Sequence, residues 1–201
     1  MTPAEVVPMP GLALADYTDD RLAIRLADRL RGKFLHVWPW AAWLKWDGAR
    51  WARDPGAGVL AEAVESAREC YDDLAETFLV NPTAKDARPK LKFAEYARSR
   101  RGLENAIHLA RAGDGIPIEP EKLDADPLLL NTASGLLDLT TGELHPHDPA
   151  ALCTKVTNAA FDPTAKCPTW DEFLRVVTGD DAELAEFLQL AAGYSLTGLT
   201  R

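Results

Sequence analysis

The sequence predicts an α+β protein that is predominantly α-helical. Apolar residues repeat at helical spacing over residues 18–32 and 58–78, residues 44–51 alternate as in a β-hairpin, and residues 128–149 carry short apolar runs between Ser-Gly and Thr-Gly turns. We therefore expect an N-terminal helix with a Trp-rich β-hairpin, a helical middle, and a C-terminal β-meander followed by helices. The expected divisions are a flexible lead (1–17), an N-terminal helical subdomain with the hairpin (18–113) and a C-terminal subdomain (114–201).

The first helix is predicted from a cap and an apolar stripe. Thr18 can accept a hydrogen bond from the backbone at the helix start, and Gly32 is a typical stop. Between them, five apolar residues recur on one helical face, which predicts that this face is buried: Leu22, Ala23, Leu26, Ala27 and Leu30.

A β-hairpin is predicted in the stretch WPWAAWLKWDGARW, residues 38–51, which contains five of the six tryptophans. Asp47-Gly48 is a strong signal for a two-residue type I′ turn, since both residues tolerate positive φ. This turn would place Leu44, Trp46 and Trp51 on one apolar face and Trp43 on the opposite, mixed face. We interpret these residues as a structural hairpin packed on a helix; an aromatic platform for stacking sugars or nucleobases is the alternative.

The middle of the chain is predicted to be helical. Residues 58–78 carry a long apolar repeat, which includes Leu60, Ala63, Ala67 and Tyr71. Two shorter helices are expected over the basic segment that follows, with Ser99 as the cap between them. Phe93 and Ala97 mark the first of these helices, while Leu103, Ile107 and Ala110 mark the second. Residues 114–130 are acidic and Pro-rich, which is typical of a connector.

The last two helices are predicted from their caps. Thr169 with Glu172 resembles a capping box ahead of Phe173 and Leu174. Asp180 with Glu183 would begin the final helix, which carries Leu184, Phe187, Leu188 and Ala191. Gly193 is expected to end it.

Charge is distributed unevenly along the chain. The net charge is −9, which argues against general affinity for nucleic acids or membranes. Residues 85–111, however, hold eight Lys or Arg against three Asp or Glu, a net charge of +5. Their cations could neutralise phosphates, or they could answer the acidic segments of the chain, and both interpretations remain open: Lys85, Arg88, Lys90, Lys92, Arg98, Arg100, Arg101 and Arg111.

No catalytic or metal site is predicted. His145, His147 and Asp148 offer at most three ligands without a supporting His or Cys, and paired acids such as Asp72-Asp73, Asp124/Asp126 and Asp180-Asp181 are explained as helix faces, loops or caps. Neither a G-x-S-x-G elbow nor a phosphate-binding G-x-x-x-x-G-K-[ST] occurs, so we expect no ATP or GTP hydrolysis by this chain. A carboxylate- or metal-dependent hydrolase and an aromatic ligand-binding module remain the alternative functions.

The three widely spaced cysteines indicate a reducing compartment with no disulfide framework. The N-terminus does not resemble a signal peptide, and no stretch is apolar for long enough to span a bilayer. We therefore expect a soluble protein in the cytoplasm of a bacterial host cell.

Three ordered strings resemble a known family: NTASGLLDLTTGELHPHDP, FDPTAKCPTWDEFL and GDDAELAEFLQLAAGYSLTG. They are similar to the poxvirus-type primase-helicase N-terminal domain of phage and plasmid primase-helicases, which precedes a superfamily III helicase core. The helix after Thr18 and the string WLKWDGARW resemble the opening of these proteins. Ser134 and Phe161 depart mildly from the pattern, where Asn and Tyr are common. The matching positions are Asn131, Gly135, Asp138, Gly142, Pro146, Asp162, Pro163, Pro168, Trp170, Gly193, Tyr194 and Gly198.

The resemblance implies a non-catalytic domain that assists DNA engagement, ring assembly or partner docking in DNA replication. It implies weak DNA binding, contacts with replication proteins, and self-association as a ring through a downstream helicase domain. No cofactor is implied for this chain, whereas ATP and Mg²⁺ are implied for the parent. We also expect the parent to continue beyond Arg201 into a Gly-rich loop that ends in Gly-Lys-Ser or Gly-Lys-Thr.

Overall fold

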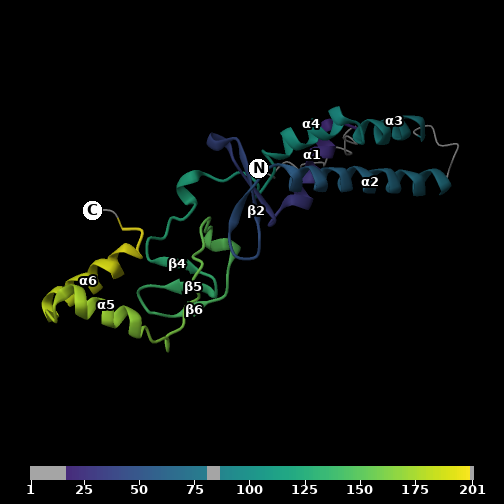
Figure 1. The fold of residues 1–201 in the computed structure, drawn as a ribbon. Helices are drawn as coiled ribbons and strands as arrows, with labels where there is room; N and C mark the ends of the chain where they lie inside the picture. Colours follow the sequence, from purple (N-terminus) through teal and green to yellow (C-terminus); the bar gives the residue numbers. More distant parts are fainter. Residues whose placement is uncertain (1–16, 81–86, 200–201) are drawn as a thin grey trace, which may run out of the picture. The chain divides into compact units, whose positions relative to one another are not determined.

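The fold combines helices with two small sheets. The computed structural model describes residues 17–80 and 87–199. Within those ranges the chain forms six α-helices and two three-stranded antiparallel sheets, which confirms the α+β class (Figure 1). The chain divides into two compact units, which we call the helical unit (Met1–Lys45 with Arg53–Ile118) and the meander unit (Trp46–Ala52 with Glu119–Arg201).

Four helices form the helical unit: α1 Asp19–Leu30, α2 Ala57–Val80, α3 Ala87–Ala97 and α4 Arg100–Ala110. Helix α1 packs against both α2 and α4. Thr18 caps α1 by accepting a hydrogen bond from the backbone amide of Arg21, and all five residues of the predicted stripe are buried, so that prediction is confirmed. Among the described helices, none is long and apolar enough to cross a membrane.

The core of the helical unit lies between these helices and includes Phe34, Trp43 and Ile116. The predicted helix over residues 58–78 is confirmed as α2, but its buried face matches the predicted one only in part. Leu60 and Tyr71 are 48% and 40% exposed. Ala63 and Ala67 are buried as predicted, and the face extends to Val59, Ser66 and Cys70, because α2 lies close to α1 and α3 on this side.

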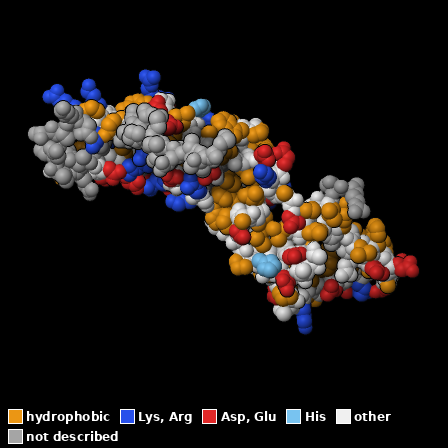
Figure 2. All heavy atoms as spheres, turned by 180° about the vertical axis from the view of Figure 1, so that it is seen from behind, with side chains coloured by type: hydrophobic (Ala, Val, Ile, Leu, Met, Phe, Trp, Pro, Cys, Tyr) orange, Lys and Arg blue, Asp and Glu red, His pale blue; other side chains and the backbone are white. Residues whose placement is uncertain are grey.

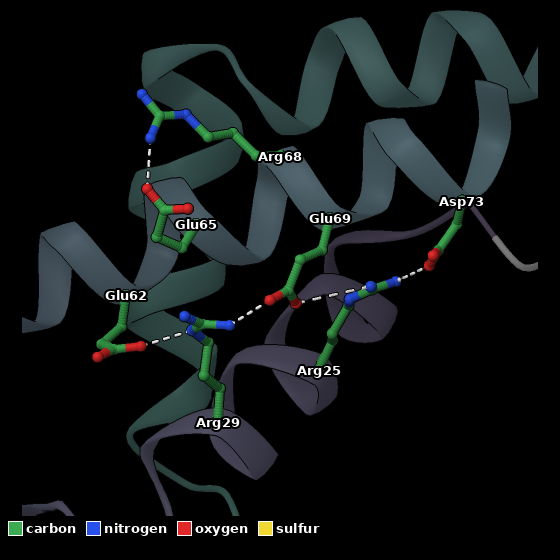
Figure 3. A network of polar contacts seen from close by, with 7 residues as sticks. All are labelled: Arg25, Arg29, Glu62, Glu65, Arg68, Glu69 and Asp73. Carbon is green, nitrogen blue, oxygen red and sulfur yellow. Dashed lines mark hydrogen bonds and ion pairs between the residues drawn. The ribbon is translucent and has the colours of Figure 1, made fainter. Parts of the chain in front are cut away.

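Ion pairs join the exposed edges of α1 and α2 (Figure 3). Arg25 lies 2.6 Å from Asp73 and 3.7 Å from Glu69, and Arg29 lies 2.5 Å from Glu62 and also pairs with Glu69. Hydrogen bonding to Glu62 raises the pKa of Arg29 above its ordinary value. Glu69 pairs with both arginines, which makes this a connected network along the side where the two helices pack.

The first sheet has the order β1-β2-β3. Its elements are β1 Phe34–Val37, a 3₁₀ turn Trp38–Trp40, β2 Ala42–Trp46 and β3 Trp51–Asp54. The predicted connector contributes to this region, since the amide of His36 donates to Ile116 O at 2.8 Å and the amide of Ile118 donates to His36 O at 3.0 Å. Ile116 is fully buried. The start of the connector therefore extends the edge of the sheet, which its acidic, Pro-rich composition did not predict.

The hairpin turn differs from the predicted one. The amide of Asp47 donates to Arg50 O at 3.1 Å, so Gly48 and Ala49 are the enclosed residues. Gly48 has a φ of +103° whereas Ala49 has no positive φ, so the turn lacks the two positive φ values that type I′ requires. The side chain of Asp47 accepts from the amides of Ala49 and Arg50, both at 2.9 Å. Because these two hydrogen bonds form when Asp47 precedes the enclosed pair, they favour that position over the predicted one inside the pair.

The burial of the hairpin tryptophans is also partly different from the prediction. Leu44 and Trp51 are buried, as expected, but Trp46 is only partly buried. Trp43, which was placed on the less buried face, is 6% exposed and belongs to the core of the helical unit. Both faces of β2 are therefore covered at this point. A two-sided burial cannot be recognised from alternation alone.

The meander unit encloses the hairpin turn. The amide of Trp51 donates to Cys153 O at 2.8 Å and its indole Nε1 donates to Pro149 O at 2.9 Å. Asn131 Nδ2 donates to Ala49 O at 2.9 Å and to Lys155 O at 2.8 Å. The buried Asn131 amide thus ties the turn to the segment that follows the meander.

The predicted β-meander is confirmed, with antiparallel order β4-β5-β6. Its strands are β4 Leu129–Thr132, β5 Gly135–Asp138 and β6 Leu144–His145, with 3₁₀ turns at Pro120–Lys122 and Pro149–Ala151. Gly135 has a φ of +145°, and a Cβ there would lie 2.2 Å from His145 O. Only glycine fits where these two strands approach so closely.

Two helices close the described chain, as predicted: α5 Pro168–Thr178 and α6 Ala182–Ser195. Their ends differ from the prediction. Pro168 begins α5 and no side chain caps it, so Thr169 does not form the expected capping box. Asp181, not Asp180, caps α6 by accepting from the amides of Glu183 and Leu184, and the helix continues through Gly193 to Ser195. Proline suits the first helical turn, which moves the start ahead of Thr169.

Candidate nucleic-acid interface

The predicted basic patch lies on α3 and α4, which meet at a tight corner. Ser99 caps α4 by accepting from the amide of Gly102 at 3.1 Å, as predicted. A Cβ on Gly102 would lie 2.3 Å from Tyr96 O, so the first turn of α4 packs directly on the backbone of α3. This close approach brings the last residues of α3 next to the first cations of α4.

A polar cluster holds the corner against α1. Tyr96 Oη donates to Asp19 Oδ1 at 2.6 Å, and Asn105 Nδ2 donates to Asp19 Oδ2 at 2.8 Å and to Tyr96 Oη at 3.1 Å. The hydrogen bond to Asp19 raises the pKa of Tyr96 above its ordinary value. Three helices therefore meet at one satisfied carboxylate, which provides a rigid frame for the basic side chains.

Three of the predicted cations have partners or are partly enclosed within the helical unit. The Arg98 guanidinium lies 5.2 Å from the centroid of the Tyr71 ring. Arg100 Nε donates to Glu104 at 2.7 Å on the exposed side of α4. Arg111 is partly buried, and its Nε has no hydrogen-bond partner in the described chain. The densest run of the sequence, Arg98 to Arg101, therefore supplies fewer free charges than its composition suggests.

Three other predicted cations remain available to solvent. Arg88, Lys92 and Arg101 are exposed, and none forms an ion pair with another residue in the described ranges. Arg88 and Lys92 are four residues apart and so lie on the same face of α3. Lys90 is partly buried and has a polar partner, and Lys85 lies outside the described residues. Figure 2 shows Lys and Arg side chains projecting from the helical unit.

The aromatic stretch does not form a single platform. Trp43 is in the core of the helical unit and Trp51 is buried in the meander unit. Trp38 and Trp40 are 49% and 47% exposed. The edge of Trp38 meets the ring of His36, with centroids 4.9 Å apart. The tryptophans thus divide between core packing and partial exposure, which favours the structural interpretation of the hairpin.

His36 is a buried group that the sequence did not single out. It is 1% exposed, its ring lies between Trp38 and Trp43, and neither ring nitrogen has a partner in the described chain. Burial, with a contribution from the charge of Arg111, lowers the pKa of His36 to about 4. No periodicity marks such a residue, since β1 is buried on both faces.

The candidate metal ligands do not converge. His147 Nδ1 lies 3.1 Å from Asn131 Oδ1, and Asp148 Oδ1 accepts from the amide of Ala150 at 2.8 Å. His145 lies 3.9 Å from Glu143. Within residues 17–80 and 87–199, no group of three or more His, Cys, Asp or Glu side chains is arranged to hold a metal ion.

The paired acids also have local partners. Asp73 binds Arg25, and Asp124 accepts from the amide of Thr154 at 2.7 Å and from its hydroxyl. Asp181 caps α6. The Asp181 contact supports the interpretation as a cap, and Asp73 is in addition an ion-pair partner.

Comparison with known proteins assigns the chain to a family. Residues 23–179, more than three quarters of the chain, match the family described as D5 N terminal like. The match spans α1 to the residue that caps the C-terminal end of α5, and it confirms the resemblance found in the sequence motifs. No curated protein matches the chain. The chain therefore belongs to the D5 N terminal like family, the N-terminal domains of phage and viral D5-type primase-helicases.

Proposed function

We propose that this chain is the DNA-engaging, non-catalytic N-terminal domain of a replicative DNA helicase. One observation carries the proposal: Arg88, Lys92 and Arg101 are exposed on α3 and α4 without an acidic partner among the described residues. Unpaired cations on a rigid frame can neutralise backbone phosphates with little loss of side-chain pairing. Family membership supports the setting, because domains of this type belong to primase-helicases.

The proposed contact is electrostatic and independent of DNA sequence. Cations that replace condensed counterions on the strand bind phosphates without reading base edges. The whole chain carries a net charge of −9, so the affinity of the chain alone should be weak. In the parent, a helicase domain would supply ATP and Mg²⁺ chemistry and ring assembly, and replication proteins in the host cytoplasm would be the partners. The domain would orient the strand for that motor.

The test compares two triple variants with the same change in net charge. Arg88→Ala/Lys92→Ala/Arg101→Ala removes the proposed contacts, and Lys122→Ala/Lys155→Ala/Lys166→Ala removes three cations of the meander unit as the control. Fluorescence anisotropy of a labelled oligonucleotide is measured across a salt series. The first variant should flatten the slope of log affinity against log salt by up to about two units on single strands, at about 0.7 unit for each lost contact.

The control should keep most of the wild-type slope. Equal losses in both variants would reduce the effect to net charge alone and refute a specific interface on α3 and α4. Circular dichroism of both variants should match the wild type, since all six substituted residues are exposed.

A further inference from the structure

The helical hairpin formed by α5 and α6 leaves large apolar side chains uncovered. Six of them are 43–67% exposed, and we call them the hairpin face: Trp170, Phe173 and Val177 on α5, with Leu184, Phe187 and Leu190 on α6. Thr178 is the single buried residue of these two fully described helices. The hairpin thus lacks the cover that an amphipathic helix pair normally has within a domain.

Helical spacing places these side chains in stripes. Trp170, Phe173 and Val177 follow the i, i+3, i+7 pattern, while Leu184, Phe187 and Leu190 are three residues apart. The rings of Trp170 and Phe173 stack with centroids 5.4 Å apart, which makes a continuous aromatic surface. Figure 2 shows apolar and acidic side chains next to each other in this part of the chain. Continuous stripes suit a helix lying along the hairpin.

The exposed area is large for an uncovered surface. Three aromatic side chains of about 200 Å² that are roughly half exposed leave about 300 Å² of apolar surface, and Val177, Leu184 and Leu190 add to it, so the face is within the range of the largest patch on a monomer. A standard protein–protein interface buries about 800 Å² on each partner. The hairpin face therefore has the size of the apolar part of a specific interface.

Charge decides which partner fits. Residues 168–199 carry six Asp or Glu and one Arg, a net charge of −5. Arg175 is held by Glu172 at 2.8 Å and by Asp180 at 3.4 Å, so it is not free for a partner. Glu183 and Glu186 make no ion pair in the described chain. Each precedes an apolar residue of the hairpin face by four positions, so both carboxylates border that face.

The acidic border disfavours two other occupants. A second copy packed hairpin to hairpin would bring carboxylates of the same sign together, which is destabilising. An anionic membrane surface would repel the same groups. A helix with Lys or Arg beside its apolar stripe can cover the hairpin face with the stripe and pair its cations with the carboxylates at the border.

We propose that the hairpin face binds an amphipathic helix of another protein, with an apolar stripe flanked by Lys and Arg. The contact is a helix-in-groove interaction in which apolar anchors supply affinity and basic flanks pair with Glu183 and Glu186. It uses the meander unit, and none of the residues proposed to bind DNA takes part, so the two proposals stand or fall separately.

The test uses the full chain and two labelled peptides of about 18 residues, about five helical turns. Both have Leu at the same helical positions, and their remaining residues are Lys in one and Glu in the other. Anisotropy should report binding of the Leu/Lys peptide at least about tenfold tighter than of the Leu/Glu peptide. Phe187→Ala/Leu190→Ala should weaken Leu/Lys binding at least about tenfold. Leu91→Ala/Leu109→Ala is the control: it truncates two leucines of α3 and α4 that are 47% and 43% exposed, and it should not change the binding of the Leu/Lys peptide.

A second pair of variants separates local from overall charge. Glu183→Gln/Glu186→Gln should weaken binding of the Leu/Lys peptide roughly three- to tenfold. Glu119→Gln/Glu121→Gln changes the net charge of the chain by the same amount and should not weaken this binding. Equal binding of the two peptides, or equal effects of the two charge variants, would overturn the proposal. So would a wild-type dimer that Phe187→Ala/Leu190→Ala converts to monomer, or sedimentation with anionic vesicles that this variant abolishes, because either result assigns the face to another occupant.

Discussion

Trp43→Ala tests whether the tryptophan-rich stretch is structural. Trp43 is 6% exposed and contacts the core of the helical unit, and its ring meets that of His36 at 4.9 Å. About 200 Å² of apolar surface at about 25 cal/mol per Å² gives about 5 kcal/mol as an upper estimate of the lost transfer free energy. Large-to-small changes of buried aromatic residues cost roughly 3–5 kcal/mol. We expect a loss of unfolding free energy in that range.

Trp40→Ala is the matched control, because Trp40 comes from the same stretch but is 47% exposed. Because about half of Trp40 is already exposed, its truncation removes about half as much buried area as the truncation of Trp43. The site is open to water, so no closed cavity remains. We expect a cost of roughly 1–2 kcal/mol. The difference between the two variants removes errors that affect both equally, such as the area assumed for the unfolded chain.

The assay must report on the helical unit alone, because a two-unit chain need not unfold in one step. Hydrogen exchange of the α1 amides, followed by mass spectrometry, measures the local opening free energy. A loss of 3–5 kcal/mol corresponds to exchange that is faster by about two to more than three orders of magnitude, at about 1.4 kcal/mol per factor of ten. A cost below about 1 kcal/mol for Trp43→Ala, or equal costs for both variants, would refute the reasoning about burial.

Two further predictions follow from single positions. The pKa of His36 is lowered to about 4 by burial, from an ordinary value of 6.5, so the unfolded chain binds more protons below pH 6.5. The contribution of His36 to stability is therefore fully present above pH 6.5 and is lost as the pH falls towards 4, by up to about 3 kcal/mol. Urea denaturation at pH 7, 5.5 and 4.5 should show a smaller pH dependence for His36→Phe; identical dependence would contradict the assignment. Gly135→Ala should be more destabilising than Gly142→Ala by about 2 kcal/mol or more, as measured by thermal unfolding, because both have positive φ but only Gly135 faces a backbone oxygen. Equal costs would show that the β5–β6 approach can relax.

Features with a local physical cause could be predicted from the sequence. The stripe of α1 repeats with the period of a helix, and its cap needs only the hydroxyl of Thr18 three residues before Arg21 N. Ser99 caps α4 in the same way. The β-meander and its Gly135 turn were also predicted, since strand alternation and turn glycines are determined over a few residues. The motif strings likewise led to the family that the comparison assigns.

Where the local signals competed, the choice needed the structure. Asp47-Gly48 suggested a type I′ turn, but the Asp47 side chain caps the amides of Ala49 and Arg50, and the enclosed pair moves by one residue. Pro168 likewise begins α5 ahead of the expected cap at Thr169. Each alternative satisfies backbone amides, and a single cap contributes only about 1 kcal/mol, so local signals alone do not decide between them.

For the hairpin tryptophans and the basic run, only the tertiary structure decided which side chains are covered and which charges are free. Trp43 and Trp46 are both tryptophans of β2, yet Trp43 is in a core made by helices far away in the chain. Arg98 and Arg101 belong to one basic run, yet only Arg98 lies over the ring of Tyr71, on α2. The sequence by itself determined where helices, strands and the basic segment occur, because these depend on neighbours within a few residues. Burial and pairing depend on contacts between residues distant in sequence, and those exist only once the chain is folded.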